Sequence, residues 1–368
     1  MAATMVVLFH ATQSLHRDFG SEALPSFVQG ARGVDVFFVI SGFIIVYVSR
    51  NAAYDGWTFL ARRFARVAPP YYLASSVMLV VALFIPQVLQ STTLTWPHTI
   101  ASFLFIPWDN PETASAFPLL QIGWTLNAEM QFYAIFAAVF FLPSVLRAMA
   151  ASCVIFALVH VGFLANPENQ TLAAWTNPII IEFIFGMAIA LLWEKRLCRG
   201  GTALGWSIFA VGMTLILSLP ITIDGLDNAI AFLLAGVPAA MIVYGLLVVE
   251  RASTIRDIPW LGLLGDASYA LYIWHFFVLG AVRVFWKYTN FDGVVNDIMF
   301  ISAVLIAAII TSIFAYLWLE RPLVSFAARH LAGRRKLSVA PVACRFEKDG
   351  SIVPASIGVF DASPKHPY

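Results

Sequence analysis

The stretch WTLNAEMQFYAIFAAVFFLP, residues 124 to 143, is apolar enough to enter a lipid bilayer, yet an acidic residue lies near its start. A membrane-spanning helix needs about 20 predominantly apolar residues, and this stretch carries a single charged side chain, Glu129. Burying a charge at the centre of a bilayer costs at least a few kcal/mol, about 3 or more. The stretch therefore predicts a membrane helix whose acid has either a functional role or a buried partner.

The composition of the whole chain agrees with a membrane protein. Of 368 residues, 60% are hydrophobic and 12% are charged, and the mean hydropathy is +0.81. Soluble domains are about 45–50% apolar and about 25% charged. The three cysteines, Cys153, Cys198 and Cys344, are too far apart in the sequence to indicate a disulfide framework or a zinc site. We expect an all-α polytopic membrane protein that has no metal and no nucleic-acid partner.

Ten segments are candidates for spanning helices. They cover residues 1–14, 30–49, 70–90, 122–142, 148–165, 175–193, 203–222, 229–249, 262–286 and 295–319. This pattern predicts a bundle of about ten transmembrane helices over residues 1–322, followed by a polar cytoplasmic tail, residues 323–368, that is loosely ordered from about residue 340. Residues 91–121 contain four prolines and only a short apolar run, which is typical of a folded outer loop or a re-entrant piece.

The positive charges lie in alternate connections. Lys and Arg occur in the connections 50–69, 143–147, 194–202 and 250–261, whereas none occurs in 91–121, 166–174 and 223–228. Positively charged connections stay in the cytoplasm. The distribution therefore predicts that both termini are cytoplasmic.

The first apolar segment starts at Met1, without a basic region before it and without a cleavage site after it. It is therefore not a signal peptide. A helix of roughly 14 residues is shorter than the ~17 to 25 residues that a span requires. We expect the natural form to begin upstream of Met1.

Two sets of polar residues share a helix face. Glu129 and Tyr133 are four residues apart, and Ser268, Tyr272 and His275 are spaced at i, i+4 and i+7. The residues alone allow two interpretations. Both sets of polar residues either belong to a functional site, or they form interhelical contacts that hold the bundle together.

Six motifs resemble the acyltransferase-3 family of bacterial membrane O-acyltransferases, and in particular the acetylases of exopolysaccharides and O-antigens. They occur in order across the spanning region and read MVVLFHA (5–11), GARGVDVFFVISGFIIVY (30–47), RRFARVAP (62–69), WTLNAEMQFY (124–133), GDASYALYIWH (265–275) and LERP (319–322).

The resemblance implies a ten-helix enzyme of the bacterial inner membrane. Such an enzyme moves an acyl group, usually acetyl, from cytoplasmic acyl-CoA to a hydroxyl of an extracytoplasmic glycan or lipid-linked sugar. It holds no permanently bound cofactor, and acetyl-CoA is its donor substrate. The family also implies an Arg eleven positions before the histidine of the first helix, which in this numbering would precede Met1.

His10 is the expected catalytic residue. A histidine with a reference pKa near 6.5 is neutral at cytoplasmic pH and can accept the proton of a sugar hydroxyl. The same imidazole could instead carry the acyl group in a two-step relay, and both mechanisms remain open. A carboxylate, Glu129 or Asp35, would orient or stabilise that imidazole, and Glu129 is the preferred one.

Arginines near the third helix suit the phosphates of CoA, although they could equally be a cytoplasmic anchor. They are Arg62, Arg63 and Arg66. The remaining candidates for the substrate site, or for polar packing around it, are Trp124, Tyr133, Ser268, Tyr269, Tyr272 and His275.

Two other functions fit parts of the pattern. Buried acids and histidines also form the proton relays of secondary transporters, but the two halves of the chain show no inverted repeat. Acylation of a small glycosylated metabolite or of a lipid-linked oligosaccharide would use the same motifs, because these do not encode the acceptor.

Overall fold

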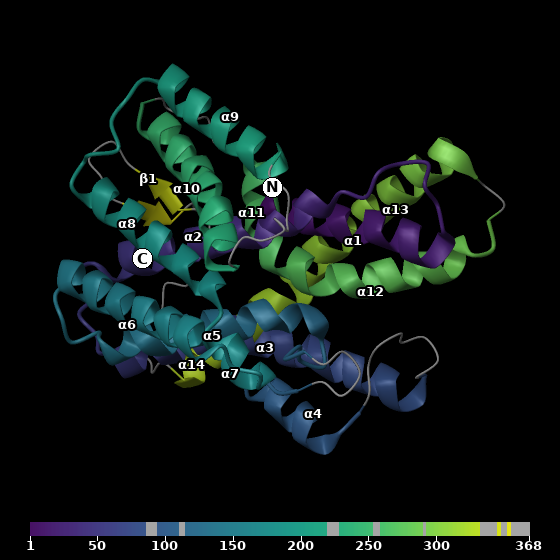
Figure 1. Ribbon diagram of the computed structural model, residues 1–368, viewed down its shortest axis with the longest axis horizontal. Helices are drawn as coiled ribbons and strands as arrows, with labels where there is room; N and C mark the ends of the chain where they lie inside the picture. Colours follow the sequence, from purple (N-terminus) through teal and green to yellow (C-terminus); the bar gives the residue numbers. More distant parts are fainter. Residues whose placement is uncertain are drawn as a thin grey trace, which may run out of the picture.

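The computed structural model describes residues 1–85, 94–109, 115–218, 228–252, 258–289, 292–331, 344–346 and 352–354 (Figure 1). The described residues form a helical bundle with one small two-stranded hairpin near the C-terminus. The helices are α1 Ala2–Phe19, α2 Gly33–Ser49, α3 Gly56–Phe84, α4 Trp96–Phe103, α5 Trp124–Ala138, α6 Ser144–Ala165, α7 Gln170–Trp175, α8 Glu182–Glu194, α9 Thr202–Ser218, α10 Asn228–Ala252, α11 Pro259–Asp266, α12 Ser268–Trp286, α13 Gly293–Ala315 and α14 Arg321–Leu331, and the strands are β1 Cys344–Phe346 and β2 Ile352–Pro354.

The all-α membrane fold is confirmed, but the number of spans is not. Within the described residues, seven helical stretches are long and apolar enough to cross a membrane. Each of the ten predicted segments overlaps a helix of the structure. The difference arises because α5 and α9 have only 15 and 17 residues and because α1 is not among the seven stretches.

The third helix starts earlier than the sequence predicted. Residues 50–69 were expected to be a connection, but α3 begins at Gly56 and continues for 29 residues. Asp55 caps it, since its carboxylate accepts a hydrogen bond of 2.8 Å from the Thr58 amide. Hydrogen bonds from Thr58 also lower the pKa of the Asp55 carboxyl. The prediction failed because the basic residues, which were assigned to a connection, lie on the first turns of the same helix.

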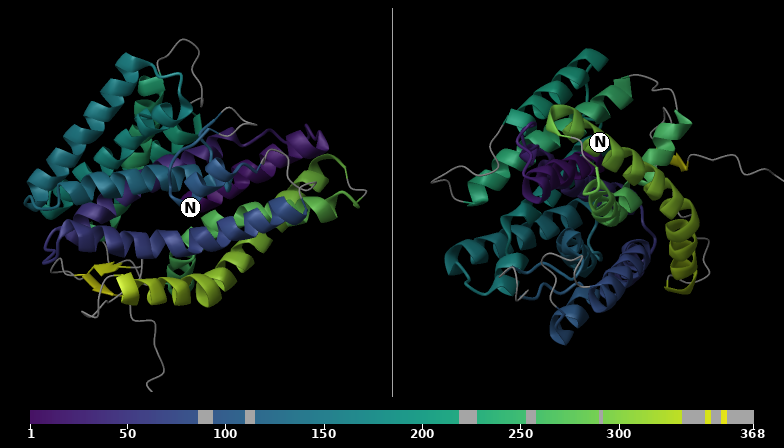
Figure 2. Two further views of the ribbon diagram at one scale, coloured as in Figure 1. Left: turned by 90° about the horizontal axis from the view of Figure 1, so that it is seen from below. Right: turned by 90° about the vertical axis from the view of Figure 1, so that its right-hand side faces the viewer.

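The C-terminal end of the bundle is also helical for longer than expected. α13 continues through a single π-helical turn, Tyr316–Glu320, into α14, so the boundary predicted after residue 322 falls inside a continuous helix. α14 packs along α3 (Figure 2). Most of the predicted tail lies outside the described residues.

α1 and α2 meet end to end near the middle of the molecule. A Cβ on Gly33 would lie 2.4 Å from the Ala2 carbonyl oxygen, and one on Gly30 equally close to that of Met5. Only glycine permits this approach, so the chain between the two helices returns along α1 before α2 begins. α1 then extends beside α12 and α13, while α2 packs against α8 and α10 (Figure 1).

Close contacts between backbones hold the α2 side of the bundle together. A Cβ on Gly186 of α8 would lie 2.0 Å from the Val39 carbonyl oxygen, and one on Gly42 of α2 would lie 2.2 Å from that of Phe183. Small residues at helix crossings are the usual means of packing membrane helices, because lipid provides no hydrophobic force between them.

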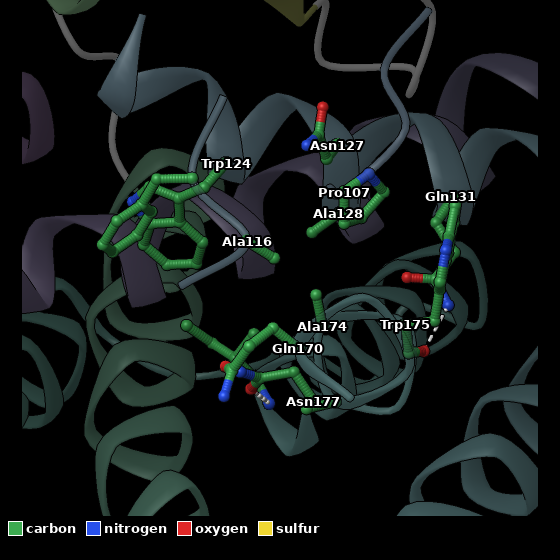
Figure 3. A pocket seen from close by; sticks show the side chains of 13 residues that line it. Pro107, Ala116, Trp124, Asn127, Ala128, Gln131, Gln170, Ala174, Trp175 and Asn177 are labelled. Atoms are coloured by element: carbon green, nitrogen blue, oxygen red, sulfur yellow. Dashed lines mark hydrogen bonds between the residues drawn. The ribbon is translucent and has the colours of Figure 1, made fainter. Parts of the chain in front are cut away.

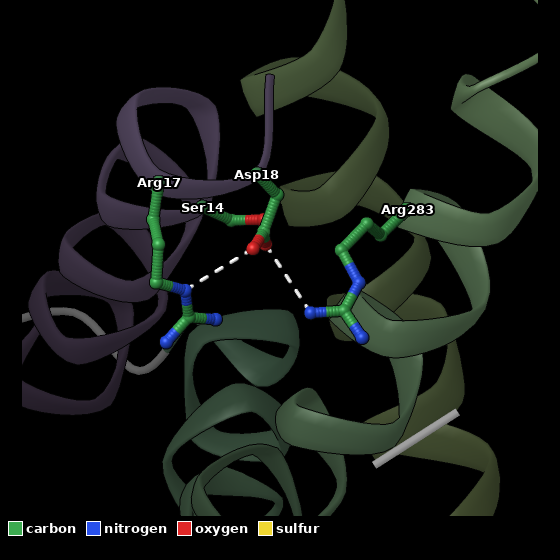
Figure 4. A network of polar contacts seen from close by, with 4 residues as sticks. All are labelled: Ser14, Arg17, Asp18 and Arg283. Atoms are coloured by element: carbon green, nitrogen blue, oxygen red, sulfur yellow. Dashed lines mark hydrogen bonds and ion pairs between the residues drawn. The ribbon is translucent and has the colours of Figure 1, made fainter. Parts of the chain in front are cut away.

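Ion pairs connect the C-terminal end of α1 to α12. Asp18 forms ion pairs with Arg17 at 3.1 Å and Arg283 at 3.2 Å, and Ser14 donates a hydrogen bond of 2.6 Å to the same carboxylate (Figure 4). The Asp18 side chain is only 4% exposed. This cluster positions the helix that carries His10.

Candidate active site

α1 and α12 bring two histidines into contact. The ring centroids of His10 and His275 are 5.4 Å apart, and the rings are tilted by 30°. Phe276 stands edge-on to both imidazoles. His275 is buried, whereas His10 is half-buried. The sequence placed these two residues at opposite ends of the chain, so only the packing of α1 against α12 reveals the pair.

The main chain determines which nitrogen of His275 carries the proton. Its Nδ1 atom lies 2.7 Å from the Tyr272 carbonyl oxygen and 3.2 Å from that of Leu271. Carbonyl oxygens only accept hydrogen bonds, so Nδ1 must donate. In the neutral ring Nε2 is then an unprotonated base, and in the described structure this buried atom has no hydrogen-bond partner. The site therefore contains an imidazole nitrogen that is ready to accept a proton.

Tyr272 links the histidines to α5. Its hydroxyl lies 2.8 Å from the Thr125 hydroxyl and donates a hydrogen bond of 3.0 Å to the Ile122 carbonyl oxygen. The ring of Tyr272 contacts Phe37 of α2 and lies 6.0 Å from the His275 ring. Tyr272 therefore fixes α12 against the beginning of α5.

Glu129 is held by side chains of two helices. Ser41 of α2 donates a hydrogen bond of 3.1 Å to Glu129 Oε1, and Tyr133 donates a very short one to the same atom. The guanidinium of Arg63 lies near Glu129 and Tyr133. These contacts agree with the packing interpretation of the Glu129–Tyr133 pair, since the acid is bonded within its own helix and also joins α2 to α5, and its functional role stays a prediction.

Tyr269 continues the polar contacts toward the arginines. Its hydroxyl donates a hydrogen bond of 2.8 Å to the Val67 carbonyl oxygen of α3, and its ring lies near Glu129, Arg66 and Glu320. Tyr272 also lies near Glu129. A series of neighbouring polar residues therefore extends from α3 to the paired histidines, and hydrogen bonds join some of its members, namely Ser41 and Tyr133 to Glu129, and Thr125 to Tyr272. We call it the polar line, and it consists of Arg63, Arg66, Tyr269, Glu129, Tyr133, Ser41, Tyr272, Thr125, His275 and His10.

Asp35 belongs to a different cluster. Its carboxylate lies 3.9 Å from the Arg32 guanidinium and next to the carboxyl group of Glu182 on α8. The contacts described for Asp35 involve neither His10 nor Glu129. The structure therefore separates the two acids that the sequence proposed as partners of His10, and it associates Asp35 with the junction of α2 and α8.

The other candidates have different surroundings. Arg62 stacks over the ring of Tyr54 at 4.2 Å, so the three arginines of the predicted cluster face different neighbours. Ser268 is the first residue of α12. Trp124 begins α5 and contacts Phe38 of α2.

The sequence interpretation missed two residues, Ser41 and Thr125. Ser41 forms a hydrogen bond with Glu129, and Thr125 forms one with Tyr272. A signal existed for Ser41, because it is a small hydroxyl residue on a largely apolar helix, whereas Thr125 is one of several polar residues in α5. Their closeness to Glu129 and Tyr272 could not be read from the chain, since these partners lie on other helices.

Comparison with known proteins identifies the class. The family model for the acyltransferase-3 acyltransferase domain matches residues 1–317, and the chain belongs to this family. It is 36% identical to the exopolysaccharide production protein ExoZ of Rhizobium meliloti over 320 residues, which cover 86% of this chain and 94% of ExoZ.

Two less similar relatives are named as acyltransferases. The acyltransferase MdmB of Streptomyces mycarofaciens is 24% identical over 76% of each chain. The O-acetyltransferase OatA of Staphylococcus aureus is 23% identical over 80% of this chain and 52% of OatA. No solved structure matches. The protein is thus a multi-pass membrane O-acyltransferase.

Proposed function

We propose that this protein transfers an acyl group, most simply acetyl, from acyl-CoA at the cytoplasmic face of the bacterial inner membrane to a hydroxyl of an extracytoplasmic polysaccharide. The observation that carries the proposal is the polar line. It joins arginines suited to a phosphate-bearing donor with a pair of histidines suited to proton transfer. In this arrangement the start of α3, with its arginines, lies on the cytoplasmic side of the membrane. The names of ExoZ and OatA support a polysaccharide acceptor and an acetyl group.

His10 acts as the base in this mechanism. The imidazole accepts the proton of the sugar hydroxyl, and the hydroxyl oxygen attacks the thioester carbonyl carbon. A carbon–oxygen bond forms and the carbon–sulfur bond breaks. The proton then passes from the imidazole to the sulfur of CoA, so that the products are the acylated glycan and free CoA.

His275 and Glu129 support that base. The unprotonated Nε2 atom of His275 is available to the proton that His10 accepts, which stabilises the cation formed during transfer. Glu129 provides a negative charge further along the polar line, and its bonds to Ser41 and Tyr133 hold it in place. Arg63 lies beside it as a counter-ion. Arg62 and Arg66 bind the phosphates of the donor in this mechanism.

Substitution of His10 tests the mechanism. His10→Ala should lower acetyl incorporation into the surface glycan by roughly 10² to 10⁴-fold, the loss associated with removing a general base, while acyl-CoA binding is retained. Glu129→Gln should give a smaller loss, because the amide keeps the shape of the side chain. The measurement is the acetyl content of purified polysaccharide, with protein abundance checked by immunoblot.

Wild-type acetylation by His10→Ala at normal abundance would refute the role of His10. Trapping a radiolabelled acyl group on the wild-type protein, and not on His10→Ala, would show the two-step relay instead of direct transfer.

A further inference from the structure

The chain that leads into α5 is bonded to the histidine site. The Ile122 carbonyl oxygen accepts a hydrogen bond of 3.0 Å from the Tyr272 hydroxyl. The backbone carbonyl oxygen of the same tyrosine lies 2.7 Å from Nδ1 of His275 and fixes the tautomer of that ring. Ile122 therefore holds Tyr272 at its hydroxyl, and Tyr272 holds His275 at its carbonyl, so the position of Ile122 affects the paired histidines.

α4 binds the segment that carries Ile122, residues 117–123, at two points. His98 Nε2 lies 2.8 Å from the Phe117 carbonyl oxygen, and the Leu119 amide donates a hydrogen bond of 2.8 Å to the Ser102 hydroxyl. His98 and Ser102 are each only 1% exposed. Two buried side chains of α4 thus hold the segment shortly before it reaches Ile122.

α4 is itself bonded to α3. The Tyr71 hydroxyl donates a hydrogen bond of 3.0 Å to the Ser102 carbonyl oxygen, and the Tyr71 side chain is buried. A Cβ on Gly123 would lie 2.7 Å from the ring of Tyr71, so the end of the segment passes directly against this ring. α3, α4 and the segment therefore pack as one unit, and a shift of α4 relative to the segment would move Ile122.

Another side of the segment borders a pocket. Ala116 and Phe117 are part of the wall of this pocket, which has a volume of about 180 Å³ and lies between the segment, α5 and α7 (Figure 3). Phe117 is half-buried. A segment beside open space has fewer packing contacts to oppose a shift. The hydrogen bonds from α4 are therefore important for keeping residues 117–123 in place.

His98 uses only one of its two ring nitrogens for this contact. A carbonyl oxygen accepts hydrogen bonds, so Nε2 donates to Phe117, and in the neutral ring Nδ1 then carries no proton. Nδ1 is buried and has no hydrogen-bond partner in the described part of the chain. Burying a polar atom without a partner is unfavourable, so packing alone would favour an apolar residue here. The bond from Nε2 to Phe117 is the feature that requires a polar side chain.

We propose that His98 is a positioning residue for acyl transfer. It anchors residues 117–123 on α4, so that the Ile122 carbonyl holds Tyr272, and Tyr272 holds His275 in the orientation that the reaction needs. Ser102 supports the same anchor. His98 thus acts through Tyr272 and not on the reacting atoms. The proposal rests on the proposed function, since it assigns His98 to the site that performs the transfer.

Two substitutions of His98 test this role. His98→Leu removes the donor, whereas His98→Gln keeps an N–H group near the position of Nε2. Transfer is measured on purified protein with radiolabelled acetyl-CoA and with oligosaccharides cut from the deacetylated polysaccharide of the producing strain. Misplacing a reacting group by about 1 Å can cost roughly 100-fold in rate. His98→Leu should therefore lower kcat by about tenfold or more, His98→Gln should recover most of it, and the KM for acetyl-CoA should not change in either.

A second substitution shows whether the effect passes through Tyr272. Tyr272→Phe removes the hydroxyl that is bonded to Ile122, so adding His98→Leu to it should lower kcat by less than about twofold further, because residues that act through one contact are not additive. Thr176→Val is the matched control. Thr176 is also buried and donates a hydrogen bond of 2.9 Å to the Leu172 carbonyl oxygen of α7, and this variant should keep the wild-type kcat.

Three results would overturn the positioning role. They are a wild-type kcat of His98→Leu, an equal loss of kcat in Thr176→Val, and losses from His98→Leu and Tyr272→Phe that multiply in full in the double variant. If size-exclusion chromatography shows that His98→Leu does not fold, Ser102→Ala replaces it, with the same expected results, because it removes the acceptor of the Leu119 amide.

Melting temperatures provide a readout that needs no transfer. If α4 acts on Tyr272 through Ile122, His98→Leu should lower the melting temperature less in the Tyr272→Phe background than in the wild type. Equal decreases in the two backgrounds would overturn the link between His98 and Tyr272. A wild-type protein that transfers no acetyl group would refute the proposed function, and the melting comparison would decide the link independently.

Discussion

At the scale of the residue, a few side chains in an apolar bundle carry the proposed chemistry. His275 shows how local structure sets reactivity, because two carbonyl oxygens of its own helix fix the tautomer and leave the buried Nε2 atom unprotonated in the neutral ring. Glu129 shows the opposite case, in which the acid is oriented by a hydroxyl from another helix. Only the first arrangement follows from residues close in sequence.

Arg66 is expected to bind the donor. It lies near Glu320 and Tyr269 at the arginine end of the polar line. Because a hydrogen bond to a charged group contributes about 1.5–3 kcal/mol, Arg66→Ala should weaken acyl-CoA binding about tenfold or more, and Arg66→Lys should recover part of it. Calorimetric titration of purified protein measures the affinity. If both variants bind acyl-CoA as tightly as the wild type does, Arg66 serves only as a positively charged anchor at the membrane surface.

Asp18 is expected to stabilise the protein without taking part in transfer. Asp18→Ala leaves Arg283, which is 14% exposed, without its carboxylate partner, and breaking a buried ion pair from one side costs about 3 kcal/mol. We expect a lower melting temperature in detergent, measured by size-exclusion chromatography after heating. Glu22→Ala, an exposed acid on the following connection, should melt like the wild type. If Asp18→Ala has the same melting temperature as the wild type, the apolar contacts of α1 alone hold it in place.

At the scale of the element, the crossing of α2 and α8 depends on two glycines. Gly186→Ala places a methyl group 2.0 Å from the Val39 carbonyl oxygen, so the helices must move apart. Overpacking typically costs about 1–3 kcal/mol. We expect reduced thermal stability, and reduced transfer as well, because α2 also carries Ser41.

Gly280→Ala on α12 is the matched control for that substitution. Nothing lies within 4 Å of the added methyl group, and alanine favours a helix over glycine by roughly 0.5–1 kcal/mol. This variant should be as stable as the wild type or more so. If both alanine variants melt alike, the α2–α8 crossing tolerates a wider spacing than the structure indicates.

At the scale of the whole molecule, the orientation in the membrane decides which substrate reaches which end of the polar line. In a background without the three native cysteines, Glu168→Cys should react with an impermeant maleimide on intact spheroplasts. Asn51→Cys should react only after the membrane is opened. Both positions are exposed in the structure. The reverse pattern would invert the bundle and place the arginines on the acceptor side.

The sequence by itself determined the class of the molecule. Helix positions followed from apolar segment length, because a bilayer imposes that length on every span. The motifs around His10, Glu129 and His275 indicated the family, which the comparisons confirm. The early start of α3 was missed, since basic residues on a helix and in a connection look alike in a charge count.

The tertiary structure alone decided which polar residues meet. His10 and His275 are 265 positions apart in the sequence, and only the packing of α1 on α12 brings them together. The packing of α2 against α8 places Asp35 beside Glu182 instead of His10. Local periodicity assigns a residue to a face of its own helix, but the partner of that face depends on how the helices pack.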